Sequence, residues 1–109
     1  MDCIFCKIID KNIPSDIVYE DERVMSFKDI SPKAPFHILI LPKKHIESVN
    51  HLKKNDIDLI GYLFLTAKKI AEQKHLAGYK LVINVGRKGG QLIDHMHLHF
   101  LAGEEIKMP

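Results

Sequence analysis

The chain has 109 residues, 46% of them hydrophobic and 28% charged, with a formal net charge of +2 at pH 7; this length suits one domain and is too short for two. The weak charge neither demands nor excludes a nucleic-acid partner, no apolar run is long enough to cross a bilayer, and residues 1–20 lack the pattern of a signal peptide. We therefore expect a single cytoplasmic domain over residues 1–109, with no membrane or nucleic-acid partner.

The first half of the chain predicts one short helix and three strands. The stretch IFCKIID (4–10) predicts the helix, and DIVYEDERVMSFKDI (16–30) predicts two short strands joined by a polar turn at residues 20–22. The stretch PFHILILP (35–42) is bounded by prolines and rich in β-branched and aromatic residues, which favours a buried strand.

A long helix is expected from about Asp56 to Leu76, where apolar residues recur at helical spacing. Asn55 is a good N-cap for this helix, and basic residues stand in its last turn. Gly78 follows the last apolar position and is expected to end the helix.

Two further strands are expected near the end of the chain, at YKLVINVG (79–86) and HMHLHFLAG (95–103), with a turn at RKGGQ (87–91) between them. Hairpin-length connections favour antiparallel pairing. The order of elements therefore predicts an α+β fold, in which helices cover one face of a five-stranded antiparallel sheet.

Three histidines stand at every second position in QLIDHMHLHF (91–100), where His95, His97 and His99 alternate with apolar residues. On a strand, this alternation puts the imidazoles on one face and the apolar side chains toward the core. The face could be a metal site, a catalytic site in which imidazole acts as nucleophile and proton carrier, or a solvated surface. Three histidines in register on a strand built for burial make the solvated surface the weakest of these interpretations.

Two neighbouring features strengthen a chemical interpretation of the histidines. His37 lies inside the apolar 35–42 stretch, where an imidazole needs a polar partner, and we expect it beside the histidine strand. Gly86, Gly89 and Gly90 precede the histidines and would let backbone N–H groups converge on an anion, although a plain hairpin turn is the alternative.

The only two cysteines, Cys3 and Cys6, have the spacing of a zinc half-site. Spacing alone does not choose the other two ligands among seven histidines. A redox pair and two free, buried thiols are the competing interpretations, while a structural disulfide is not expected in a reducing compartment.

Several separated segments together resemble one known family, the histidine triad family, and are closest to its nucleotide-binding Hint branch. The similarity extends from Cys3 to about Gly103. It includes the triad motif His-φ-His-φ-His-φ-φ, where φ is apolar. The segments that carry it are CIFCKII (3–9), DISPKAPFH (29–37), PKKHI (42–46) and QLIDHMHLHF (91–100). The resemblance implies a homodimer whose two sheets join into one continuous ten-stranded sheet, with the long helix and the 79–86 strand as candidate interface elements.

The resemblance also implies an activity, the hydrolysis of the phosphorus–nitrogen bond in purine nucleoside phosphoramidates. His97 would attack phosphorus and form a nucleotidyl-histidine intermediate, which water then resolves. His99 and His37 would contact the phosphate. No cofactor is required for these steps.

The implied ligand is a purine nucleoside monophosphate or its phosphoramidate. Asp29 would bind the ribose hydroxyls and Asn84 would lie near phosphate and ribose, although a turn residue and a strand-edge residue are the alternatives. Further phosphate contacts are implied at Gly90, Gln91 and Leu92. The apolar walls of the base pocket are implied at Phe5, Ile8, Phe27, Ile30 and Leu39, any of which could instead be ordinary core.

A zinc-containing sub-group of the family implies the full ligand set of the cysteine site, which is Cys3, Cys6, His45 and His95. With four protein ligands, such a zinc would be structural.

The chain departs from the branch at Leu92, where a serine often stands next to the leaving group. A leucine has no proton to donate, so protonation of the leaving group must come from elsewhere. Histidine rather than glutamine at position 99 favours hydrolysis over nucleotidyl transfer. The alternatives are a dinucleoside polyphosphate hydrolase, a non-catalytic nucleotide-binding or scaffold protein, and a metalloenzyme with all three triad histidines on one metal.

Overall fold

The computed structural model describes residues 3–103 and 106–107. Its centre is a five-stranded antiparallel sheet with the strand order β1-β2-β3-β5-β4, which confirms the expected α+β class. The strands are β1 (Ile17–Glu20), β2 (Val24–Lys28), β3 (Phe36–Pro42), β4 (Lys80–Val82) and β5 (Leu98–Ala102). The α-helices are α1 (Ile4–Ile9) and α2 (Ile57–Gln73), and short 3-10 helices occur at Val49–His51, Lys54–Asp56 and Arg87–Gly89.

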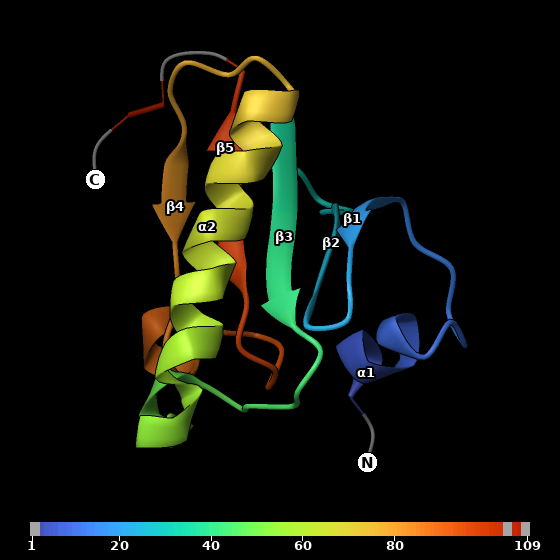
Figure 1. The fold of residues 1–109 in the computed structure, drawn as a ribbon, viewed down its shortest axis with the longest axis vertical. Helices are drawn as coiled ribbons and strands as arrows, with labels where there is room; N and C mark the ends of the chain where they lie inside the picture. The colour runs from blue at the N-terminus through green and yellow to red at the C-terminus, as the bar shows by residue number, and fades with distance from the viewer. Residues whose placement is uncertain (1–2, 104–105, 108–109) are drawn as a thin grey trace.

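The central strand β3 is buried on both faces, which explains its continuous apolar sequence. Ile38 and Ile40 belong to the core under α2, which lies across one face of the sheet (Figure 1). Leu39 and Leu41 belong to a second core, which packs against Phe5 of α1. The expectation that the helices cover only one face is therefore wrong, because α1 closes the opposite face.

Both ends of α2 differ from the sequence-based expectation. Asn55 does not cap it, because it lies within a 3-10 helix whose last residue, Asp56, accepts a hydrogen bond from the Lys53 backbone N–H at 2.9 Å. At the other end, His75 adopts a left-handed conformation with φ of 56°, so the helix ends before Gly78. None of the helices among the described residues combines the length and apolar character needed to cross a bilayer.

The two C-terminal strands are shorter than expected, and this sets the position of the histidines. In β4, the residues after Val82 leave the sheet and lead into the glycine loop. In β5, pairing begins only at Leu98, because the Met96 N–H donates to the Ile46 carbonyl at 2.6 Å instead of to a sheet partner. His95 and His97 therefore precede the strand, and simple alternation does not describe their directions.

Candidate active site and metal centre

A cavity of about 550 Å³ opens beside β3, β4 and β5, and two of the triad histidines line it. Most of the expected catalytic and binding residues lie in its wall: Phe5, Asp29, Ile30, His37, Leu39, Asn84, Gly90, Leu92, His97 and His99. The wall also contains residues that were not expected from the sequence: Ile4, Ser31, Lys33, Lys80, Val82, Ile93 and Leu101. Nothing distinguished these seven from ordinary core or surface positions.

The His97 imidazole is held in one tautomer by a hydrogen bond to the backbone. Its Nδ1–H donates to the His95 carbonyl at 2.7 Å, so Nε2 carries the lone pair. Among the described residues, Ser26 Oγ is the only buried side-chain nitrogen or oxygen that lacks a hydrogen-bond partner. His97 Nε2 is therefore open to the cavity. The Phe5 ring meets the imidazole edge-on at 5.1 Å between centroids and supports its orientation.

His37 and His99 form a directed hydrogen-bond relay that starts at a backbone amide. The Lys33 N–H donates to His37 Nδ1 at 2.9 Å, so the His37 proton resides on Nε2. That N–H donates to His99 Nδ1 at 3.0 Å, which leaves His99 Nε2 as an N–H donor. The cavity thus contains one imidazole with a free lone pair and a second with a free donor.

Burial keeps these imidazoles neutral at physiological pH. It lowers the pKa of His97 and of His37 below the usual value for histidine. Burial, reinforced by the neighbouring His97 and His37, lowers the pKa of His99 to about 4. A neutral imidazole has the lone pair that a nucleophile needs, so the site is prepared for attack at neutral pH.

Asp29 serves the turn and the site together. Its Oδ1 accepts from the Ser31 backbone N–H at 2.8 Å, while Oδ2 lies 3.4 Å from His37 Nε2. Asp29, His37 and His99 could also be considered as a metal-binding group, since their donor atoms lie within 4.8 Å of one another. However, the Lys33 amide keeps a proton on His37 Nε2, so these atoms form a relay and not a set of free lone pairs.

Gln91 does not line the cavity, contrary to the expected nucleotide contact. Its side chain is only 1% exposed, and every polar atom is occupied. Nε2 donates to the Glu47 carbonyl at 2.6 Å and to the Ile93 carbonyl at 2.9 Å, and Oε1 accepts from the Gly86 N–H at 2.9 Å. Gln91 therefore holds the glycine loop in place. In that loop, Gly90 adopts φ of 90°, a conformation that favours glycine.

Two expected base-pocket residues, Ile8 and Phe27, also lie outside the cavity wall. Both are buried in the core between α1 and the sheet, where they support the wall from behind. Phe27 meets Phe5 edge-on at 5.4 Å. Ile30 and Leu92, in contrast, are 97% and 77% exposed at the mouth of the cavity.

His95, the first histidine of the triad motif, does not line the cavity. It belongs to a different cluster, with Cys3, Cys6 and His45. The donor atoms of these four residues lie within 4.8 Å of one another. The Nδ1 atoms of His45 and His95 are 3.2 Å apart. The sulfur–nitrogen distances are 3.5 Å for Cys3–His95, 3.6 Å for Cys6–His95 and 3.3 Å for Cys6–His45.

This donor set fits a tetrahedral zinc ion. With Zn–N of about 2.0–2.1 Å and Zn–S of about 2.3 Å, the edges of a tetrahedron are about 3.3 Å between nitrogens and about 3.5 Å between nitrogen and sulfur. The His95 Nε2–H donates to the Pro42 carbonyl at 2.8 Å, which leaves Nδ1 as the ligand atom and orients the ring. Burial and a hydrogen bond with Cys3 raise the pKa of Cys6 to about 11, so the thiolate needs a cation nearby.

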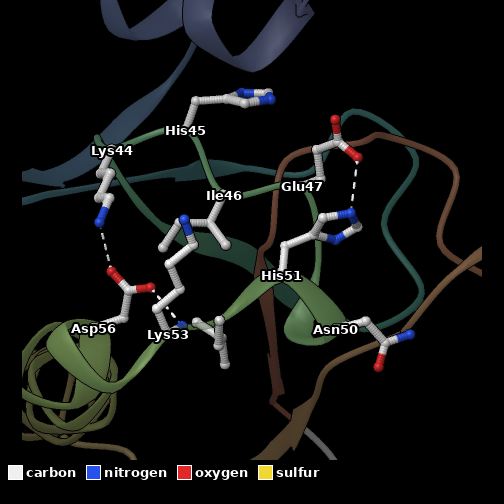
Figure 2. Close-up of a pocket in the computed structure, with 9 residues that line it drawn as sticks. Lys44, His45, Ile46, Glu47, Asn50, His51, Lys53 and Asp56 are labelled. Atoms are coloured by element: carbon white, nitrogen blue, oxygen red, sulfur yellow. Dashed lines mark hydrogen bonds and ion pairs between the residues drawn. The ribbon is translucent and has the colours of Figure 1, made fainter.

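The loop that carries His45 is fixed by contacts on both of its sides (Figure 2). The Lys44 ammonium donates to the buried carboxylate of Asp56 at 2.6 Å, and His51 Nε2 lies 3.2 Å from the Glu47 carboxylate. These contacts border a separate cavity, of about 460 Å³, which none of the triad histidines lines. The loop therefore positions His45 beside the two cysteines, apart from the histidine cavity.

The three triad histidines thus do not share one site. His95 directs its ligand atom toward the cysteines, while His97 and His99 face the cavity. Neither metal-binding group found in the described residues contains all three, which argues against a single metal held by the triad.

Comparisons with known proteins agree with this fold and with the triad motif in the sequence. The family model described as "Scavenger mRNA decapping enzyme C-term binding" matches residues 2–108. An uncharacterised HIT-like protein from Synechococcus elongatus is 46% identical over 109 residues, which cover 99% of this chain and 96% of the relative. The crystal structure of a HIT family hydrolase from Legionella pneumophila superposes with a TM-score of 0.96 at 44% identity, covering 99% of this chain and 98% of that one. A histidine triad protein from Clostridium difficile also gives a TM-score of 0.96, at 42% identity, and the match covers 100% and 96% of the two chains.

Proposed function

The chain belongs to the histidine triad (HIT) family, and from this premise we propose that it hydrolyses purine nucleoside phosphoramidates through a covalent nucleotidyl-histidine intermediate. The observation that carries the proposal is the pair of complementary imidazoles in one cavity. His97 presents a lone pair on Nε2, and His99 presents an N–H donor. A phosphoryl group between them would contact a nucleophile and a hydrogen-bond donor at the same time.

The reaction proceeds in two displacements. His97 Nε2 attacks the α-phosphorus, a phosphorus–imidazole bond forms, and the bond from phosphorus to the amine breaks. The positive charge that develops on His97 is stabilised by the His95 carbonyl, which accepts from Nδ1–H. His99 donates to a phosphoryl oxygen. The amine leaves with a proton from solvent or from the His37–His99 relay, and water then attacks phosphorus and releases His97.

The nucleoside end of the ligand fits the rest of the cavity wall. Asp29 offers a carboxylate to the ribose hydroxyls, and Asn84 and Gly90 border the phosphate position. Phe5 and Leu39 offer apolar surface to a purine base. The base pocket has more apolar than polar character, so it favours a flat ring without choosing strongly between adenine and guanine.

Zinc is proposed as a structural component, held by Cys3, Cys6, His45 and His95. When bound, it would tie α1 to the sheet, and α1 carries Phe5 to the His97 ring. It takes no part in the displacement, because its four ligands leave no position for water. Its thiolates must be reduced, which fits a reducing compartment such as the cytoplasm.

A homodimer is proposed through β4 and α2. The strand β4 is at one edge of the sheet, where a second copy could pair and extend it to ten strands. The helix exposes apolar side chains on its outer surface at Ile57, Phe64 and Leu65, which such a copy would cover. Sedimentation should give a dimer mass at micromolar concentration, and a monomer mass would contradict this assembly.

Release of AMP from adenosine 5′-phosphoramidate is the direct assay of the activity. We expect turnover by the wild type, its loss in His97→Ala, and unchanged turnover in His75→Asn, which replaces an exposed histidine after the end of α2 and away from the cavity. Tight binding of AMP without turnover would instead support a nucleotide-binding or scaffold protein. Faster hydrolysis of dinucleoside polyphosphates would support the alternative hydrolase.

A further inference from the structure

A second cavity, of about 440 Å³, adjoins the histidine cavity. The two cavities share three lining residues, Ile4, Leu92 and Ile93, which form an apolar ridge between them. No step of the proposed mechanism uses this second cavity. A ligand whose phosphate lies at His97 would have to pass over the ridge to reach it.

The ridge exposes apolar surface that the described residues, 3–103 and 106–107, do not cover. Leu92 is 77% exposed and Ile4 is 45% exposed, while Ile93 is partly buried against the core under α1. Single exposed apolar residues are ordinary on protein surfaces. Here they line the same two cavities, so they stand beside the histidine cavity that would hold the phosphate.

The ridge is also held rigidly, so a ligand would not need to order it. On one side of Leu92, the buried Gln91 side chain fixes the loop through its three hydrogen bonds. On the other side, Asp94 accepts from both terminal nitrogens of Arg87, at 2.7 and 3.1 Å, and Arg87 Nη1 also donates to the Gln91 carbonyl at 2.8 Å. A preorganised apolar surface loses little entropy when it binds a ligand.

The charges around the second cavity restrict what can occupy it. The Arg87–Asp94 pair is neutral overall, and the Glu47 carboxylate adds one negative charge to the wall. Cys3 and His45 also line the cavity, and with the other two proposed ligands they would form a zinc site without net charge, since two thiolates balance the ion. His51, which does not line this cavity, has its Nε2 3.2 Å from the Glu47 carboxylate and its Nδ1 2.8 Å from the Ser48 hydroxyl. An acidic leaving group would therefore be repelled, whereas a neutral apolar one would not.

We propose that the second cavity is the leaving-group subsite and that Leu92 is its specificity-determining residue, which selects phosphoramidates of amines with an apolar body. This inference rests on the proposed function. It adds that the amine is chosen by contact with the ridge, whereas the nucleotide is chosen by the histidine cavity.

The test compares two substrates that differ only in the amine, adenosine 5′-phosphoramidate and its N-phenethyl derivative. For each protein, the ratio of the two kcat/KM values is measured. The ratio for a variant is then compared with the ratio for the wild type, because the intrinsic reactivity of each leaving group cancels in this comparison. Leu92→Ser should lower the preference for the phenethyl substrate by about tenfold, the low end for loss of apolar contact in a half-open pocket. Leu92→Met should retain most of the preference because it keeps the apolar contact.

Ile17→Ser is the matched control, since Ile17 is an exposed apolar residue on β1, away from both cavities. It should leave the ratio at the wild-type value. If both substrates are hydrolysed and Leu92→Ser leaves the ratio unchanged, the subsite is refuted while the proposed function stands. If Leu92→Ser changes the sedimenting mass instead of the ratio, the ridge is a subunit interface. If the wild type hydrolyses neither substrate, the subsite falls together with the proposed function.

Discussion

Gln91→Leu should reduce both the stability of the protein and its activity, although Gln91 does not itself line the cavity. The substitution keeps the approximate volume of the side chain and removes its amide. Three backbone groups then lose their partners, namely the carbonyls of Glu47 and Ile93 and the N–H of Gly86. The Gln91 side chain is 1% exposed, so water does not readily replace it.

The magnitude follows from these three losses. An unpaired buried backbone group costs about 1–3 kcal/mol, and the lower half of that range applies in a loop that can relax toward solvent. We therefore expect a loss of about 3–6 kcal/mol, a large part of the typical 5–15 kcal/mol for a folded domain. Because Gly90 and Leu92 flank Gln91, the loop should also shift at the phosphate position, and kcat/KM should fall by at least about tenfold.

Urea unfolding at pH 7 measures the first effect and phosphoramidate turnover the second. Gln73→Leu is the control, since Gln73 is exposed at the end of α2 and its replacement should change stability by less than about 0.5 kcal/mol. A loss below about 1 kcal/mol for Gln91→Leu, with unchanged turnover, would refute the role of Gln91 as the residue that holds the loop.

Three further predictions concern the hairpin, the metal and the glycine loop. Burial opposes ionisation of Asp21, but hydrogen bonds from Tyr62, two backbone N–H groups and a second tyrosine outweigh it and lower the pKa from 3.8 to about 2. The ionised Asp21 therefore stabilises the folded state above about pH 4, and this stabilisation is lost as the pH falls toward 2. Asp21→Asn should lower the free energy of unfolding by at most about 2 kcal/mol at pH 7 and by little at pH 2. The control Asp16→Asn, at an exposed position, should lower it little at either pH. Metal analysis should find about one zinc per chain, and a strong chelator should lower the melting temperature by several degrees. The chelator should have no such effect when both cysteines are replaced by serine. A metal-free protein whose melting temperature does not change with chelator would contradict the site. Gly90→Ala should lower the free energy of unfolding in urea by about 1–2 kcal/mol, because alanine is strained at the positive φ of this position. The added Cβ would cause no clash, since its nearest contact is 3.7 Å from Asn84 Cγ. An unchanged free energy of unfolding would show that the conformation is not strained.

Local patterns were sufficient to predict most of the elements. The two short runs around a polar turn in 16–30 and the apolar run in 35–42 predicted β1, β2 and β3 nearly as observed. The need of His37 for a polar partner correctly placed it beside His99. These predictions succeeded because each depends on the periodicity or the polarity of a single segment.

The errors arose where a contact between distant segments decides the local conformation. Alternation alone predicts that β5 begins at His95, but the Met96 amide pairs with Ile46, and the pairing turns His95 away from His97. The family resemblance implies a nucleotide contact at Gln91, but its burial against Glu47 has no signature in the sequence. The Lys33 amide, which sets the tautomer of the relay, could not be found from side-chain patterns at all.

The most direct test of the central claim is a rapid-quench experiment with an adenosine phosphoramidate labelled on phosphorus. The arrangement of His97 Nε2 and His99 Nε2–H predicts acid-labile label on the wild-type protein within the first turnover, located on His97 and absent from His97→Ala. Turnover by the wild type without any protein-bound label, or label on a different residue, would contradict His97 as the nucleophile.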